Sequence, residues 1–500
     1  MSEPPVAPTA DDGHLKRKAA AGAVWTVLGM GGGNILRLLS SLILTRLLLE
    51  EHFGLMALVN TFITGLHMLS DVGVGQAIVQ NKRDDPDFVN TVWTVNVIRG
   101  VLLFLVATAF AEPYAAFYQQ PILAPLLRVA AVSALFDGFL SASFFTQHRR
   151  LNLKRLVGCE LGSVIIGTTV TIIWALISPS IWALVWGGVV SAAALTVLSH
   201  VWLPGIRNRF RLDGEAARSM LSFGLWIFFS SAMTFGGNHL DMLIFGKLTT
   251  MATLGIYSIA AMLAMVLGRI ITKLSLNVLF PLYSATHHSD RDLAETYAAA
   301  RVPLLTLAGW VVAGIAAGGA TVVHLLYDSR YADAGWMLQI LVLGAWFRAL
   351  ASGHNAVTLA VGRSDWVAAS AAGKVVGVAV LVYLGYSFLG FPGAILGVVG
   401  ATATSYVVSV SVARMLGFDG WLVDLRFSIR VAISGVAGWS ALQWVTNAGF
   451  DNALLHVLVV FVVVTAFWAR PLLGLLRRAR RGKPILPKSG QSGSEPSPAA

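Results

Sequence analysis

The sequence predicts an all-α polytopic membrane protein with about 14 transmembrane helices. Apolar residues make up 56% of the 500 positions and charged residues 12%, and the mean hydropathy is +0.72. This composition is typical of a chain that crosses a bilayer many times. Apolar runs of about 20 residues, long enough to span a hydrocarbon core of about 30 Å, recur along almost the whole length.

The distribution of basic residues supports this count. Of the 36 Lys and Arg residues, only Arg46, Lys247 and Arg330 fall in loops predicted to lie outside. Because Lys and Arg accumulate in cytoplasmic loops, this bias predicts an even number of spans with both termini in the cytoplasm. The net charge of +11 is scattered over short turns, so we expect no nucleic-acid partner. The predicted spans are 22–45, 55–79, 91–110, 122–144, 157–177, 181–203, 221–245, 253–281, 302–326, 336–360, 367–387, 392–413, 427–446 and 454–476.

The ends of the chain are polar. Residues 1–20 are expected to form a disordered cytoplasmic tail that ends in a basic cluster, and the first apolar run reads as an uncleaved span. Residues 477–500 begin basic and become rich in Pro and Ser, as expected for a second disordered tail next to anionic membrane lipids. The single cysteine, Cys159, excludes an internal disulfide and a Cys-rich metal site.

An internal repeat divides the predicted spans. Residues 32–34 and 236–238 both read Gly-Gly-Asn, and a Gly-containing segment follows each, at 53–58 and 254–259. Two six-helix repeats around a central cavity are a common transporter architecture. Because six is even, the repeats would be parallel, related by an axis along the membrane normal. The predicted halves are 21–219 and 220–415, with two additional helices in 416–476.

One stretch carries a more specific signal. The second span begins near Phe53-Gly-Leu-Met-Ala-Leu and closes with Asp71-Val-Gly-Val-Gly-Gln-Ala-Ile-Val-Gln80. This pattern resembles the polysaccharide transporter (Wzx-like) family of lipid-linked oligosaccharide flippases, within the multidrug/oligosaccharidyl-lipid/polysaccharide exporter superfamily. The resemblance covers roughly residues 20 to 420. It implies a cationic cavity between two halves, lined partly by the first, second, seventh and eighth spans.

Ionisable side chains within apolar spans are costly unless they face a cavity or a partner. The candidates for binding an anionic substrate are Arg37, Arg269, Lys273 and Arg348. Arg269 and Lys273 are four residues apart, so they share one helix face, and the planar guanidinium suits phosphate oxygens. Arg37 has an equally weighted alternative, a structural ion pair with Asp241.

Three acidic residues are candidates for coupling transport to a proton or sodium ion: Asp71, Asp137 and Asp241. Asp71 also has a structural interpretation, as a cap or ion-pair partner near the turn that follows it. Arg99 and Lys374 lie near a predicted cytoplasmic edge and are expected to extend towards it. Embedded histidines such as His354 show no metal-ligand spacing and are interpreted as packing or polar lining.

The favoured function is a flippase for polyprenyl-diphosphate-linked oligosaccharide in the bacterial inner membrane, for exopolysaccharide, capsule or O-antigen synthesis. We expect no enzymatic activity, cofactor or metal, and possible contact with polymerase or export machinery. One alternative is an ion-coupled multidrug or cation extruder of the same superfamily, which would need an acidic cavity. A membrane-embedded polymerase or glycosyltransferase would need a large outer loop with catalytic carboxylates, and the predicted outer loops are short.

Overall fold

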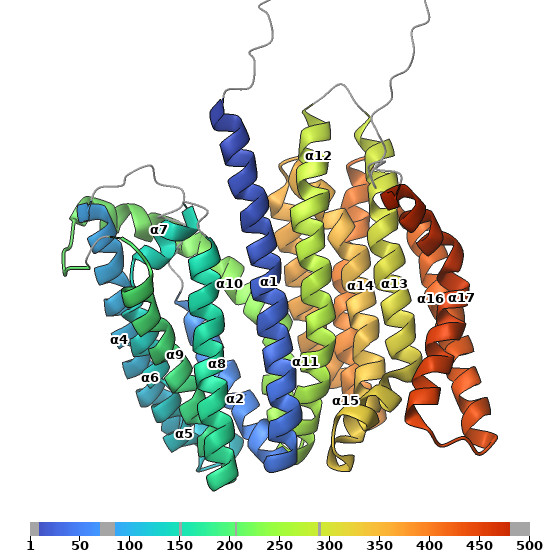
Figure 1. Cartoon of the computed structure of the whole chain (residues 1–500), viewed down its shortest axis with the longest axis horizontal. Helices are drawn as coiled ribbons and strands as arrows, with labels where there is room; N and C mark the ends of the chain where they lie inside the picture. Colours follow the sequence, from blue (N-terminus) through green and yellow to red (C-terminus); the bar gives the residue numbers. More distant parts are fainter. Residues whose placement is uncertain (1–9, 71–85, 150–152, 206–207, 289–291, 481–500) are drawn as a thin grey trace, which may run out of the picture. The chain divides into compact units, whose positions relative to one another are not determined.

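A computed structural model describes the chain except for residues 1–9, 71–85, 150–152, 206–207, 289–291 and 481–500. The described chain folds into helices joined by short connections (Figure 1). It divides into two compact units, residues 1–258 and 259–500, and the boundary falls inside one helix. The predicted division at residue 219 into two six-helix halves remains a prediction.

The first unit is built from α1 to α10 and the beginning of α11. Its helices are α1 (Ala10–Leu47), α2 (Glu50–Leu69), α4 (Pro86–Tyr118), α5 (Leu123–Ala130), α6 (Val132–Gly138), α7 (Ser143–Arg149), α8 (Leu153–Ile177), α9 (Trp182–Trp202), α10 (Gly214–Leu248) and α11 (Met251–Leu274).

The predicted span 122–144 is not one helix but the short helices α5 and α6 and the start of α7. Helix α6 packs against α4 where two glycines meet: a Cβ on Gly100 would lie 2.8 Å from the Cα of Gly138 and 2.6 Å from the carbonyl oxygen of Ala134. Such a close approach is possible only without side chains. It places the polar residues of both helices next to each other.

The two glycines that the repeat pairs with each other are in direct contact. Gly54 begins the Gly-containing segment of the first repeat, and Gly255 occupies the corresponding place in the second. A Cβ on Gly54 would overlap the carbonyl oxygen of Met251 and lie 3.1 Å from the backbone nitrogen of Gly255, and a Cβ on Gly255 would overlap that of Glu50. This reciprocal contact shows that α2 and α11 cross with their backbones in contact, which requires a glycine on each helix.

The second unit contains the rest of α11 and all later elements. These are the π-helix η1 (Ser275–Leu279), α12 (Phe280–His287), α13 (Leu293–Leu326), the 3₁₀ turn η2 (Ser329–Tyr331), α14 (Asp333–Ala360), α15 (Ser364–Met415), α16 (Trp421–Asn447) and α17 (Ala453–Arg480). Helix α15 contains two predicted spans, which are separated at Gly390, where φ is 64°.

The core of this unit is centred on α13. Helices α14, α16 and α17 all pack against it, and Figure 1 shows α16 and α17 as an antiparallel pair beside it. Trp468 of α17 is fully buried among residues of α13 and α16, including Val312 and Val431. The two additional C-terminal helices are therefore an integral part of the second unit.

The described helices agree with the predicted polytopic fold. Most predicted spans fall on one helix each; 122–144 falls on consecutive short helices, 253–281 covers α11, η1 and the start of α12, and 55–79 begins on α2 and runs beyond the described residues. Within the described residues, nine helices are long and apolar enough to cross a membrane by length and composition. The chain is thus an all-α, multi-pass membrane protein.

Candidate functional site

Three of the four cations predicted to bind substrate belong to the second unit and come from the neighbouring helices α11 and α14. Arg269 and Lys273 are exposed near the end of α11. Arg348 comes from α14, and its side chain lies across Gly268: a Cβ there would be 3.2 Å from the Arg348 Nε. Because Gly268 directly precedes Arg269, the absence of a side chain lets Arg348 reach the turn of α11 that carries Arg269.

The backbone changes form just beyond these cations. The π-helix η1 begins two residues after Lys273, and the Oγ of Ser275 donates a 2.8 Å hydrogen bond to the carbonyl oxygen of Ser352 on α14. A π-helix is an uncommon conformation that occurs often at functional sites. Here it accompanies a hydrogen bond between η1 and α14, two residues after Lys273.

Arg37 and Asp241 do not form the alternative ion pair in this structure. Arg37 is exposed on α1 and makes no ion pair within the described part of the chain. The carboxylate of Asp241, half-buried on α10, accepts a hydrogen bond from the hydroxyl of Tyr257. Arg37 therefore stays a candidate for ligand binding, in the first unit.

Asp137 lies in a polar group formed by α2, α4 and α6. Its Oδ2 is 3.6 Å from the Nε2 of His67, and Asn96 donates to its carbonyl oxygen at 2.9 Å. Arg99 caps the end of α2 by donating to the carbonyl oxygens of His67 and Ser70 at 2.8 and 3.0 Å. We expected Arg99 to extend to the membrane edge, but it instead satisfies carbonyl groups that a helix end leaves unpaired.

Asp71 lies outside the described residues, as does the rest of the motif that ends at Gln80.

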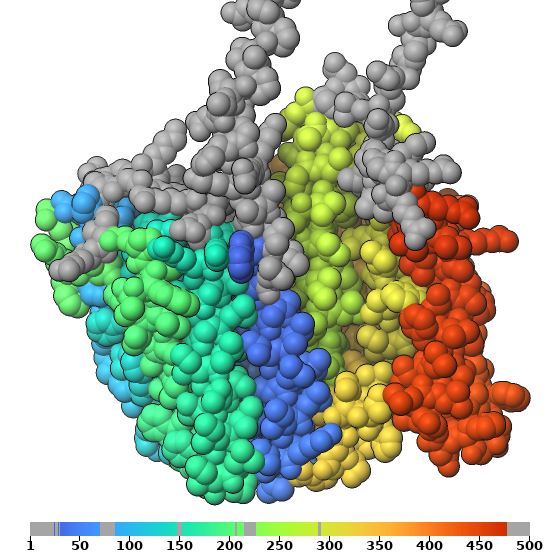
Figure 2. Space-filling view, viewed as in Figure 1, coloured from blue at the N-terminus to red at the C-terminus, as the bar shows by residue number. Residues whose placement is uncertain are grey.

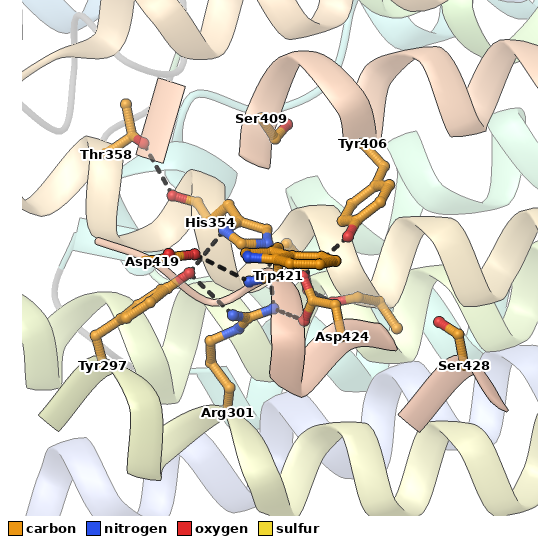
Figure 3. Close-up of polar contacts among 12 residues, drawn as sticks. Tyr297, Arg301, His354, Thr358, Tyr406, Ser409, Asp419, Trp421, Asp424 and Ser428 are labelled. Atoms are coloured by element: carbon orange, nitrogen blue, oxygen red, sulfur yellow. Dashed lines mark hydrogen bonds and ion pairs between the residues drawn. The ribbon is translucent and has the colours of Figure 1, made fainter. Parts of the chain in front are cut away.

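The second unit also contains a buried charged cluster, which we define as Tyr297, Arg301, His354, Tyr406 and Asp424 (Figure 3). Arg301 is 1% exposed, and His354 and Asp424 are 0% exposed. The carboxylate of Asp424 accepts from Arg301 Nη2, from His354 Nε2 at 2.7 Å and from the Tyr406 hydroxyl at 3.1 Å. Three donors thus surround one carboxylate and compensate its removal from water.

The directions of these hydrogen bonds fix the proton positions. Arg301 Nη1 donates to the Tyr297 hydroxyl at 2.9 Å, so that hydroxyl donates its own hydrogen to His354 Nδ1 at 2.7 Å. His354 therefore carries its proton on Nε2 and donates it to Asp424. The cluster is a closed ring of hydrogen bonds with Asp424 as the final acceptor.

Two glycines make room for the Arg301 side chain in this cluster. A Cβ on Gly353 would lie 2.7 Å from Arg301 Nε, and a Cβ on Gly420 would overlap Arg301 Nη1. The cluster joins α13, α14, α15 and α16. Because its charged groups are sealed from solvent and from ligands, we interpret it as the anchor of α16 and not as a transport site.

Sequence reasoning missed this cluster. Arg301 lies one residue before the predicted span 302–326, and Asp424 lies just before the predicted span 427–446. A signal for the longer helix was present: Asp292 accepts from the backbone nitrogen of Ala294 at 2.8 Å, and Glu295 follows three residues later, as at a helix start.

The chain resembles known proteins over most of its length. The sequence pattern of the polysaccharide biosynthesis protein family matches residues 43–336. The succinoglycan biosynthesis transport protein ExoT of Rhizobium meliloti (strain 1021) is 25% identical over 64% of this chain and 64% of that protein. The lipopolysaccharide biosynthesis protein WzxC of Escherichia coli (strain K12) is 22% identical over 70% of this chain and 72% of that protein.

A solved structure shares the fold. The lipid II flippase MurJ, in its inward closed conformation, aligns with 92% of this chain and 100% of its own chain at a TM-score of 0.70 and 13% sequence identity. At this identity the match concerns the fold alone.

Proposed function

Because the chain belongs to the polysaccharide biosynthesis protein family, as the motif between Phe53 and Gln80 predicts, we propose that it is a flippase. It carries polyprenyl-diphosphate-linked oligosaccharide repeat units across the bacterial inner membrane by alternating access. Both termini lie in the cytoplasm, and no bond is made or broken. Its partners are the lipid-linked substrate and the machinery that polymerises or exports the glycan.

The observation that carries this proposal is the cationic face of Arg269, Lys273 and Arg348. A diphosphate has several anionic oxygens, and two guanidinium groups with one ammonium group supply charge-assisted donors for them. Arg348 approaches this face only because Gly268 has no side chain. These cations favour a negatively charged substrate, such as one that carries phosphate. A cationic drug would instead need carboxylates in the binding site.

The first test is translocation in proteoliposomes that contain a polyprenyl-diphosphate-linked oligosaccharide. An impermeant glycan-modifying enzyme reports how much substrate has changed leaflet. We expect Arg269→Ala and Arg348→Ala each to slow translocation about ten-fold or more, since a hydrogen bond to a charged group contributes about 1.5–3 kcal/mol. The matched control is Arg128→Ala, which removes an arginine paired with Glu112 at 2.8 Å.

Either part of the proposal can fail separately. If wild-type protein moves no substrate, the flippase assignment is wrong. If wild type moves substrate and the Arg269 and Arg348 variants match it, the flippase stands and this face is not its binding site. Gel filtration of each variant establishes that it is folded.

For ion coupling we propose Asp137, among the three predicted carboxylates. A carboxylate 3.6 Å from a histidine can share or exchange a proton with it, and Arg99 in the same group responds to the charge of the pair. Binding of a proton or sodium ion at this group would change the electrostatics at the end of α2. That helix leads directly into the motif that begins at Asp71.

A further inference from the structure

The helical hairpin α16–α17 has a basic surface. Arg426 and Arg430 on α16 and Arg470 and Arg477 on α17 are all exposed. None of the four forms an ion pair with another described residue. The one carboxylate within the two helices, Asp424, is buried and engaged by Arg301. Asp419, two residues before α16, is an exposed carboxylate at this end, so four exposed arginines outnumber one exposed acid and the surface there is net cationic.

Arg430 lies across both helices of the hairpin. Its guanidinium carbon is 5.9 Å from the ring centroid of Phe427 on α16 and 5.6 Å from that of Trp468 on α17. Trp468 is held in place by a 3.1 Å hydrogen bond to the Oγ of Ser434. Arg430 is thus positioned over a rigid aromatic surface where the two helices meet.

The other arginines lie near the same end of the hairpin. Arg426 is one turn before Arg430 and shares its helix face. Because α17 runs antiparallel to α16 (Figure 1), Arg470, two residues beyond Trp468, lies towards the end where α16 begins. In Figure 2 the hairpin is the orange-red region of the surface. Asp451 lies in the turn at the opposite end, 21 residues after Arg430.

The depth of these arginines makes an anionic partner favourable. Arg430 is nine residues into α16, about 14 Å along the helix. Exposed guanidinium groups at that depth are costly in hydrocarbon, and long side chains reduce the cost by extending towards the phosphate layer. The arginine fork binds phosphate oxygens in pairs.

We propose that the α16–α17 hairpin binds an anionic glycerophospholipid, with the headgroup phosphate against Arg426 and Arg430, and with Arg470 on another face of α17 adding to the positive charge of this end of the hairpin. The acyl chains would follow exposed apolar side chains of the same helices, such as Leu425, Ile429 and Phe467. This lipid is a bound partner of the protein and not its cargo. The site lies outside the cationic face of α11 and α14, so it does not depend on the proposed function.

The test is lipid binding to the purified full-length protein, measured by native mass spectrometry. The probes are phosphatidylglycerol and phosphatidylcholine with identical acyl chains. We expect wild type to prefer phosphatidylglycerol and the triple variant Arg426→Gln/Arg430→Gln/Arg470→Gln to lose at least about ten-fold of that preference. An arginine near an anionic surface contributes about five-fold in affinity.

The matched control removes three exposed arginines elsewhere: Arg155→Gln/Arg363→Gln/Arg414→Gln. It should keep the wild-type preference, and an equal loss in the control would overturn a local site in favour of diffuse charge. Unchanged preference in the hairpin variant would also overturn it. Farnesyl diphosphate serves as a probe for the substrate headgroup: if the hairpin variant loses binding of this probe and not of phosphatidylglycerol, the surface belongs to the substrate and the lipid proposal is wrong.

Discussion

Removing Asp424 should destabilise the protein more than removing its partner Arg301. Asp424→Leu leaves a guanidinium that is 1% exposed with only the Tyr297 hydroxyl and a nitrogen of His354 as neighbours. A guanidinium stays charged in proteins. Loss of one partner from a buried ion pair costs about 3–5 kcal/mol, and we expect Asp424→Leu at the upper end of that range.

Arg301→Met should reduce the free energy of unfolding less than Asp424→Leu does. The carboxylate of Asp424 would keep the donors His354 and Tyr406, and a carboxyl group can also bind a proton and become neutral. The double variant Arg301→Met/Asp424→Leu removes both charges and should be more stable than either single variant.

The assay is the temperature at which half of the detergent-solubilised protein is lost from the monodisperse peak on gel filtration. It is measured for wild type, the two single variants and the double variant at neutral pH. The ion-pair interpretation is refuted if the double variant loses as much as the sum of the single variants. That result would mean that each side chain contributes by packing alone.

Two further predictions concern the first unit. Gly54→Ala should force α2 away from the backbone of Met251 at a cost of about 1–3 kcal/mol, which would lower the thermal midpoint and the rate of translocation. Gly188→Ala, with open space around its Cβ, should match wild type. Equal behaviour of the two variants would contradict a packed crossing. Asp137→Asn should abolish the response of translocation to an imposed ion gradient and leave equilibration of substrate intact, and the surface variant Asp365→Asn serves as its control. A gradient response that survives Asp137→Asn would rule out Asp137 as the coupling residue.

Hydropathy predicted the helices well and their ends less well. An apolar run of sufficient length predicts a membrane-spanning helix, and residues 302–326 form such a run. The first turns of α13, from Leu293 to Arg301, include Glu295 and Arg301 and lie before the predicted span, so hydropathy predicts a loop there. Their helical state depends on the Asp292 cap and on burial against α14 and α16, and hydropathy alone does not register a cap.

Which charged side chains come close together depends on contacts that cannot be predicted from their spacing in the sequence. Arg269 and Lys273 could be grouped from the sequence because they are one turn apart on the same helix. Arg348 joins them through Gly268, which precedes it by 80 residues. That contact requires the fold, because it depends on which turn of α14 meets which turn of α11.

Arg301 and Arg269 have the same chemistry in the same unit and opposite environments. Asp424, 123 residues further along the chain, meets Arg301 and closes a ring of donors and acceptors in which the carboxylate accepts from three buried or half-buried donors. A ligand phosphate could enter only by displacing Asp424, and the displaced carboxylate would itself be buried without its cation. Arg269 is exposed beside a second cation, so a diphosphate can reach it without breaking such a ring. The accessibility of the guanidinium, more than its presence in an apolar span, therefore separates a substrate-binding arginine from an anchoring one.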